Sequence, residues 1–259
     1  MAEYHNPYHP TNKSAMTLSL SQQQDNAKFI YDYMHTNYNW TLNAVSAFVA
    51  NAAAESTMNP ARPEDSAVKN HWYPSGPYWP PDGAPNPTDT WYGFGLFQIT
   101  PFAAGPQSKR YNPYTYGNWA AANGYTMDYS TCGTCGMMEP QLIWFMSGAP
   151  EHSYVNTADP KNDQKKWYQD SRSPCNAPTP AVFGQLTDTP ENCSLTFYYN
   201  FIRSKADDPG DRPQRARYWY EYLQSYTPTP PEPPTPPTPA GIFIPWYAPI
   251  FLVNGKKIK

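Results

Sequence analysis

Ala44-Val-Ser-Ala-Phe-Val-Ala-Asn-Ala-Ala-Ala-Glu55-Ser-Thr-Met-Asn59-Pro60 is a stretch that predicts a helix with one buried face and a carboxyl group near its end. At about 100° per residue, the apolar side chains between Val45 and Ala53 form one stripe, and Glu55 lies about 280° from Val45, on the edge of that stripe. Thr41 is the expected N-cap, and Pro60 is expected to stop the helix. The fold therefore forms around an apolar helix that opens into a loop just after Glu55.

The position of Glu55 makes it a candidate general acid. We expect its carboxyl group to be half-buried, and burial disfavours the charged form of a carboxyl group. A general acid that works near neutral pH has to hold a proton, so such surroundings suit that role. Asn51, one turn earlier on the same side, is expected to orient the carboxyl group. The alternative is a solvated glutamate at a helix end, which is the commoner situation.

Two other regions have informative patterns. The motif Gly93-Phe-Gly-Leu-Phe-Gln98-Ile-Thr100 is typical of a glycine-rich strand or turn. Helical spacing is also predicted from about Ser21 to His35, with Ser21 and Gln24 as a capping box, and over 139–146, 195–202 and 213–223. These patterns predict a mainly α (α+β) fold with a small β element and long loops.

The chain from Leu20 to Leu223 resembles the phage tail lysozyme family of the lysozyme-like superfamily. The resemblance rests on Asp25-Asn-Ala-Lys-Phe-Ile-Tyr31 with the Glu55 block, on the Gly93–Thr100 motif, and on closing helices that contain Asp211-Arg-Pro-Gln-Arg215. It implies that Glu55 is the catalytic acid. It also implies that Gly95, Gln98 and Thr100 line the substrate cleft opposite that acid.

The resemblance implies a function in a virion. The expected activity is that of a muramidase-type glycosidase, a hydrolase that locally degrades bacterial peptidoglycan at the host cell wall during infection. A lytic transglycosylase is one alternative, and a non-catalytic tail-tip protein that binds cell-wall glycan or docks to tail proteins is another. The N-terminal residues lack the basic start and apolar stretch of a secretory signal, as expected for a phage tail component.

A second catalytic carboxylate is harder to identify. Inverting hydrolases need a base that activates water, and retaining ones need a nucleophile. Asp89, four residues before Gly93, is the candidate, although most aspartates in such segments are solvated turn residues. Lytic transglycosylases use one glutamate and the hydroxyl group of the substrate itself, so the type of reaction stays open.

The segment between Arg62 and Tyr92 is rich in proline and aromatic residues. Long loops of this kind are often functional. Trp72, Trp79 and Trp91 are candidates for stacking on sugar rings, whose C–H faces are apolar. The alternative is that these rings pack against the neighbouring prolines and order the loop.

The amino-acid composition limits which fold and which partners are expected. The chain has 32 prolines and 22 tyrosines among 259 residues and only 15% charged residues, which predicts a loop-rich protein. The net charge of −3 argues against a nucleic-acid partner. Peptidoglycan is the partner that the family resemblance implies. The predicted organisation is an arm over 1–19, a lysozyme-like domain over 20–226, a polyproline linker over 227–239 and an apolar tail over 240–259.

The four cysteines leave three structural alternatives open. Cys132 and Cys135 have the spacing of half a zinc site, but Cys175 and Cys193 are too far apart in the sequence to match it as a second half. Disulfides, a structural zinc site and free thiols all remain possible. No catalytic metal or other cofactor is expected, because the histidines form no pair at helical spacing.

The C-terminal tail is expected to bind a partner. Residues 241–253 are almost entirely apolar or proline and are too short, and twice interrupted by proline, to cross a membrane as a helix. Docking to phage tail structural proteins is the preferred interpretation. Contact with a membrane, or folding back on the surface of the domain, are the alternatives.

Overall fold

The computed structural model describes residues 17–62, 93–99, 112–125, 136–152, 166–202 and 208–226. The chain divides into two units, Met1–Pro228 and Thr229–Lys259, and all described residues belong to the first. The predicted polyproline linker and apolar tail lie outside the described residues, as does most of the predicted N-terminal arm. No helix in the described ranges is long and apolar enough to cross a membrane.

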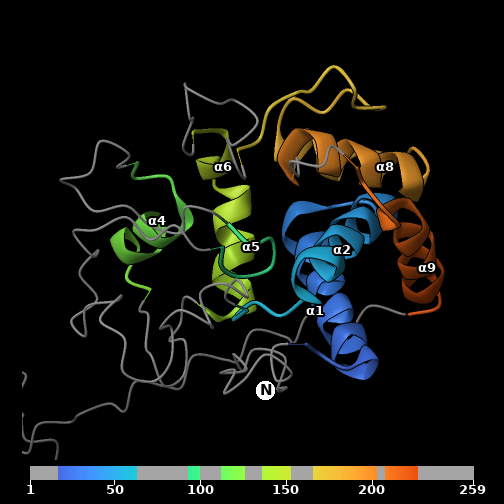
Figure 1. Cartoon of the computed structure of the whole chain (residues 1–259), viewed down its shortest axis with the longest axis horizontal. Helices are drawn as coiled ribbons and strands as arrows, with labels where there is room; N and C mark the ends of the chain where they lie inside the picture. Colours follow the sequence, from blue (N-terminus) through green and yellow to red (C-terminus); the bar gives the residue numbers. More distant parts are fainter. Residues whose placement is uncertain are drawn as a thin grey trace, which may run out of the picture. The chain divides into compact units, whose positions relative to one another are not determined.

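The described part is mainly helical, as the sequence predicts. The longest helices lie near the two ends of the described part, and the helices between them are short (Figure 1). In chain order the α-helices are α1 (Leu20–Tyr38), α2 (Leu42–Ser56), α4 (Tyr116–Ala122), α5 (Met138–Met146), α6 (Ala149–His152), α7 (Pro180–Gly184), α8 (Pro190–Phe197) and α9 (Arg212–Gln224). A π-helical turn, η5 (Tyr198–Ile202), continues α8 directly. The β element within the described ranges is one antiparallel bridge between Phe94 and Ile99.

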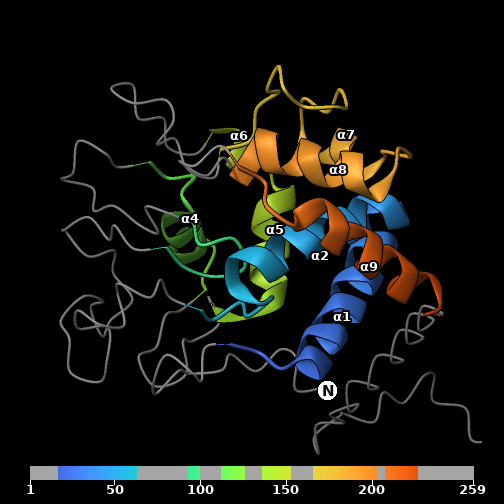
Figure 2. The ribbon, with the colours of Figure 1, turned by 45° about the vertical axis from the view of Figure 1, so that its right-hand side comes forward.

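Helix α2 is the centre of the fold. It packs most extensively against α9 and α8 and then against α1, and Figure 2 shows α9 passing close to both α1 and α2. Its residues from Ala44 to Ala53 are all buried. The predicted single apolar stripe is therefore an underestimate, since neighbouring helices cover α2 on nearly every side. Alanines make this possible, because they let the surrounding helices approach closely.

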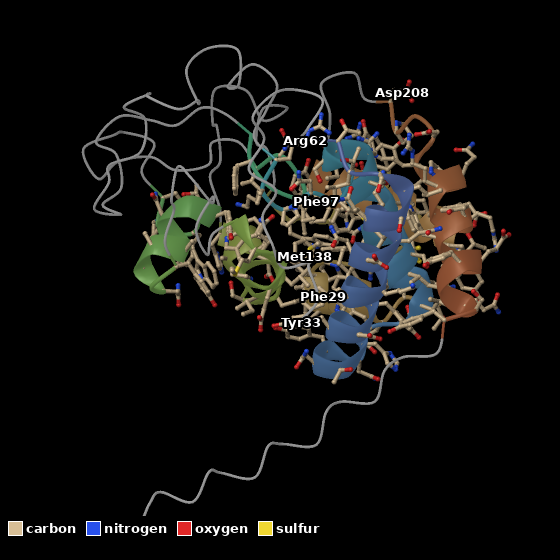
Figure 3. All side chains as sticks on the ribbon, turned by 90° about the horizontal axis from the view of Figure 1, so that it is seen from below. Phe29, Tyr33, Arg62, Phe97, Met138 and Asp208 are labelled. Atoms are coloured by element: carbon tan, nitrogen blue, oxygen red, sulfur yellow. The ribbon has the colours of Figure 1, made fainter. Side chains whose placement is uncertain are left out.

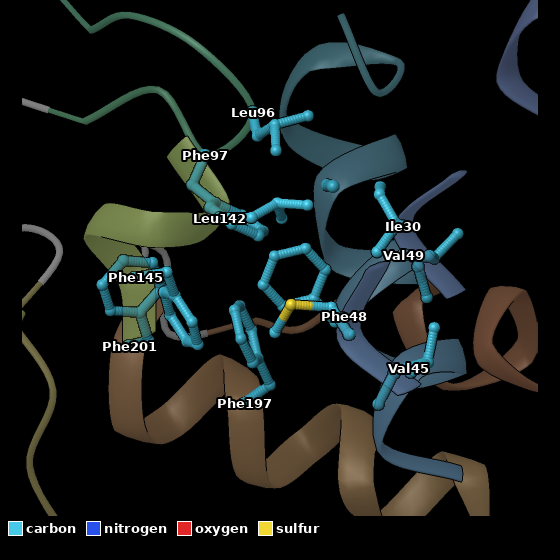
Figure 4. Packing of buried hydrophobic residues seen from close by; sticks show 14 of the residues in the cluster. Ile30, Val45, Phe48, Val49, Leu96, Phe97, Leu142, Phe145, Phe197 and Phe201 are labelled. Carbon is cyan, nitrogen blue, oxygen red and sulfur yellow. The ribbon is translucent and has the colours of Figure 1, made fainter. Parts of the chain in front are cut away.

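The core is built from aromatic rings contributed by several helices. Phe48 of α2 lies 4.8 Å, between ring centroids, from Phe97 in the 93–99 segment and 5.3 Å from Phe145 of α5 (Figure 4). Phe97 also lies 5.2 Å from Phe197 of α8. These rings meet edge to face or tilted, which suits the charge distribution of aromatic rings. The short segment that carries Phe97 is thus anchored directly in the core.

The structure corrects two predicted helix starts. The capping box of α1 is formed by Ser19 and Gln22, whose side chains each accept a hydrogen bond from the backbone N–H of the other, and not by Ser21 and Gln24. The helix predicted over 195–202 begins earlier, at Pro190, behind the N-cap Thr189. By contrast, the predicted N-cap Thr41 is confirmed, because its hydroxyl accepts from the Ala44 N–H at 3.1 Å.

Candidate active site

Glu55 lies where the sequence predicts, at the second-last position of α2. The helix ends because Thr57 adopts a left-handed conformation with φ of 54°, and its N–H bonds back to the Ala53 carbonyl. The side chain of Glu55 is 15% exposed. The predicted half-burial of this carboxyl group is therefore correct. Figure 3 shows Arg62, just after this helix end, at the opposite end of the helical core from Tyr33.

The carboxylate of Glu55 pairs with an arginine that is distant in the sequence. Nη2 of Arg212 donates to Oε1 of Glu55 at 2.6 Å, and the Arg212 side chain is only 14% exposed. Arg212 is the first residue of α9, which packs along α2. A charge-assisted hydrogen bond of this length in largely buried surroundings is strong and fixes the position of the carboxyl group.

Two further contacts hold the guanidinium of Arg212. Its Nη1 donates to the Pro209 carbonyl at 2.9 Å. Its Cζ lies 5.2 Å from the ring centroid of Tyr198, a fully buried residue at the start of the π-helical turn η5. Stacking on an aromatic face suits a planar guanidinium. These two contacts therefore hold the guanidinium of Arg212 in place independently of its bond to Glu55.

The segment Gly93–Ile99 forms a tight turn closed by the Phe94–Ile99 bridge. Gly95 has φ of 79°, and a Cβ at this position would overlap the side-chain amide of Gln141. That amide oxygen accepts from the Leu96 N–H at 2.8 Å, and the amide nitrogen donates to the Pro60 carbonyl at 2.6 Å. Only glycine suits both the backbone conformation and this close approach.

This turn is tied to the helix end that carries Glu55. The hydroxyl of Ser56 donates to the Leu96 carbonyl at 2.9 Å. The backbone N–H of Gly95 donates to the Arg62 carbonyl at 2.8 Å. The residue next to Glu55 and the exit segment of α2 therefore both hold the turn, so the end of α2 and the turn form one connected unit.

The structure brings together some of the candidate residues from the sequence. Glu55, Gly95 and Gln98 belong to this unit, whereas the other candidates lie outside the described residues: Asp89, Thr100, Trp72, Trp79 and Trp91. The amide nitrogen of Gln98 donates to the Arg62 carbonyl at 2.9 Å and to the Gly95 carbonyl at 3.2 Å. Gln98 therefore also helps to shape the turn.

The expected role of Asn51 is wrong. Its side-chain amide donates to the Ala47 carbonyl at 2.9 Å and to the Ser194 hydroxyl of α8 at 3.1 Å. Asn51 thus joins α2 to α8 inside the core. Because α2 is buried on nearly every side, a polar residue one turn before Glu55 does not have to face the same neighbour as Glu55 does.

The structure describes two of the four cysteines. Cys175 and Cys193 are buried free thiols, and burial is the main cause that raises the pKa of the Cys193 thiol above its usual value. Cys132 and Cys135 lie outside the described residues. Within the described ranges, no three His, Cys, Asp or Glu side chains gather in a way that would hold a metal ion.

Sequence reasoning missed Arg212, Gln141 and Ser56, which surround Glu55 and the turn. Gln141 had a recognisable signal, since it is a polar residue inside the apolar run Gln141-Leu-Ile-Trp144-Phe145. A buried amide in such a run usually serves backbone groups. Arg212 had no comparable signal, because nothing in its local sequence connects it with a residue in another helix.

Comparison with known proteins adds one finding. A sequence model of the family described as phage tail lysozyme matches residues 25–223, which is most of the chain. This range includes Glu55, the Gly93–Ile99 turn and Arg212. A search of curated proteins finds no match.

Proposed function

This chain belongs to the phage tail lysozyme family, and on that premise we propose that it is a glycosidase that cleaves the glycan strands of bacterial peptidoglycan. Its proposed place is the phage tail, where it opens the host cell wall locally during infection. The family supports a lysozyme-like tail protein. The muramidase-type specificity is the finer part of the proposal.

One observation carries the proposal. The carboxyl group of Glu55 lies largely buried at the C-terminal end of α2, and the same helix end holds a turn whose conformation is set by Gly95. Glycosidases need a carboxyl group that is held in place and partly shielded from water. A solvated glutamate at a helix end would not need the buried hydrogen bond from Arg212.

In the proposed reaction, Glu55 protonates the glycosidic oxygen between two amino sugars. The C1–O bond breaks, its electron pair stays on the leaving oxygen, and an oxocarbenium-like centre forms at C1. A water molecule then adds to C1 and loses its proton to a carboxylate. Glu55, now ionised, or Asp89 would accept that proton. In a transglycosylase, a hydroxyl group of the substrate itself adds in place of water.

We assign substrate contacts to the turn and to the aromatic segment. Gly95 would shape the cleft wall, Thr100 would present its hydroxyl group to the sugar, and Trp72, Trp79 and Trp91 would stack on its apolar face. For Gln98 the proposal is narrower. Its amide nitrogen already bonds to two backbone carbonyls, which supports a role in holding the turn that faces the sugar.

The C-terminal residues are assigned to attachment. We propose that 240–259 docks to a structural protein of the phage tail, with 227–239 as a spacer. The apolar character of 241–253 supports a protein partner. Deleting 240–259 should abolish incorporation into tails while the purified chain keeps its rate of peptidoglycan cleavage.

The activity test uses the full chain and purified peptidoglycan, with mass spectrometry of the soluble products. Reducing muramic ends would identify a muramidase, reducing glucosamine ends a glucosaminidase, and anhydro ends a transglycosylase. We expect Glu55→Gln to lower the rate at least about 100-fold, because the amide cannot donate the acidic proton. The amide oxygen can still accept from Arg212, so folding should be retained.

Glu191→Gln is the matched control, since Glu191 also pairs with an arginine of α9. It should leave the rate unchanged. Cleavage by Glu55→Gln at the wild-type rate would refute the role of Glu55. Peptidoglycan that stays intact but binds the wild-type chain would indicate a tail protein that only binds glycan.

A further inference from the structure

We propose that Arg212 is the positioning residue of Glu55: it fixes the orientation of the carboxyl group and stabilises the carboxylate that remains after proton transfer. This inference rests on the proposed function. It adds a residue from α9, 157 positions away in the sequence, to the reaction assigned to α2.

The first argument is the contact itself. Nη2 of Arg212 and Oε1 of Glu55 are 2.6 Å apart, and the two side chains are 14% and 15% exposed. Screening by water is weak in such surroundings, so the attraction between the charges is larger than it would be on the surface. Of the two carboxyl oxygens, Oε1 is held by this bond, which also limits rotation of the carboxyl group.

The second argument is that Arg212 is itself held. The Pro209 carbonyl and the Tyr198 ring fix the guanidinium from two further directions. The Nε atom is buried and makes no hydrogen bond within the described part of the structure. A buried donor without a partner lowers stability, and its presence beside a candidate catalytic group favours a functional reason for the placement.

The third argument is a contrast within the same helix. Arg215 and Arg217 of α9 also form ion pairs, with Asp211 and Glu191, but both arginines are more than 40% exposed. Their pairs lie at the surface. Only Arg212, among these three arginines, reaches a carboxyl group at the end of α2.

The chemistry gives Arg212 a specific effect. When Glu55 gives its proton to the glycosidic oxygen, negative charge develops on the carboxyl group, and the guanidinium stabilises that charge. Arg212 touches no reacting atom, so it acts through Glu55. Loss of the positive charge would leave the developing carboxylate without this stabilisation. Proton transfer would then be slower, and the maximal rate would be lower.

The test is the separate measurement of kcat and KM for the full chain on solubilised peptidoglycan. For Arg212→Met we expect kcat to fall about tenfold and KM to change less than about twofold, since Arg212 does not bind the sugar. Arg212→Lys keeps the charge and should recover most of the wild-type kcat.

Arg217→Met is the control for removing an arginine from α9 and should change neither kcat nor KM. If Arg212→Met does not fold, as judged by circular dichroism, Arg212→Gln takes its place, because it removes the charge but keeps a hydrogen-bond donor. A neutral variant that folds and keeps the wild-type kcat would overturn the role of Arg212 while leaving the proposed function intact. A wild-type chain that does not cleave peptidoglycan would overturn both.

Discussion

Two arginine–glutamate pairs join α9 to neighbouring helices, and their hydrogen bonds are of similar length. Arg212 donates to Glu55 through Nη2 at 2.6 Å, and Arg217 donates to Glu191 through Nε and Nη2 at 2.7 and 2.8 Å. Their surroundings differ. The side chains of the first pair are 14% and 15% exposed, and those of the second are 43% and 32% exposed.

The difference shows that burial, more than the length of the hydrogen bond, decides how strongly the two charges of an ion pair interact. Water and salt screen the Arg217–Glu191 pair, and such pairs usually add little to stability. The Arg212–Glu55 pair is largely shielded. Removing one partner there leaves a charge in poorly solvated surroundings. The same two residue types therefore form a surface contact in one place and a candidate catalytic pair in the other.

The largest expected effect comes from the turn that is bonded to the helix end carrying Glu55. Gly95→Ala should lower the free energy of unfolding by about 3 kcal/mol, because the Cβ would overlap the Gln141 amide and the backbone has positive φ. Gly148→Ala is the control, since Gly148 has φ of 80° and open space around it. It should cost about 1 kcal/mol. Equal losses in urea unfolding would show that the contact with Gln141 is unimportant.

A double-mutant cycle on each pair measures the coupling energy between its two residues, so the buried pair and the exposed pair can be compared directly. We expect a coupling energy of about 2 kcal/mol between Glu55 and Arg212 when each is replaced by alanine, and about 0.5 kcal/mol between Glu191 and Arg217. Urea unfolding of the four variants of each cycle gives these values. Similar coupling energies for the two pairs would mean that burial does not separate them.

A third pair, between Asp170 and Arg172, is intermediate between the buried and the exposed pair. Its carboxylate is buried but its guanidinium is not, because Asp170 is 8% exposed and Arg172 is 43% exposed. The hydrogen bond from Arg172 lowers the pKa of Asp170. A lowered folded-state pKa contributes stability above the pKa of the unfolded chain, and that stability is lost as the pH falls through the folded value. Wild-type stability should therefore decrease below about pH 4.

Asp170→Asn should reduce this acid dependence, at a cost near neutral pH of about 1 kcal/mol. Thermal melting between about pH 3 and pH 7 is the measurement. An unchanged slope in the variant would show that other carboxylates account for the acid dependence.

Local patterns predicted a good part of the fold. The N-cap Thr41, the end of α2 near Pro60, the helix over 139–146 and most of α9 follow from capping and periodicity, which act within a few residues. Two short helices have the same signal, although the sequence interpretation did not use it. Thr179-Pro180 starts α7 and Thr189-Pro190 starts α8, each with threonine as N-cap and proline in the first turn.

Other features could not be predicted from local patterns. Ser19 and Ser21 both precede a glutamine by three residues, and only the contacts of Leu18 with the rest of the fold distinguish them: its N–H donates to the Thr57 hydroxyl at 3.0 Å. The orientation of Asn51 toward Ser194 likewise depends on which helix covers that side of α2.

The sequence by itself determined the family, the mainly helical fold and the position of Glu55 at the end of an apolar helix, because these depend on residue order, capping and hydrophobic periodicity. Tertiary structure alone decided what surrounds that carboxyl group. The contact with Arg212 spans 157 residues, and the support of the Gly95 turn by Gln141 spans 45 between Leu96 and Gln141. Such contacts form only once the packing of α2, α5 and α9 has brought distant segments together, so no local pattern specifies them.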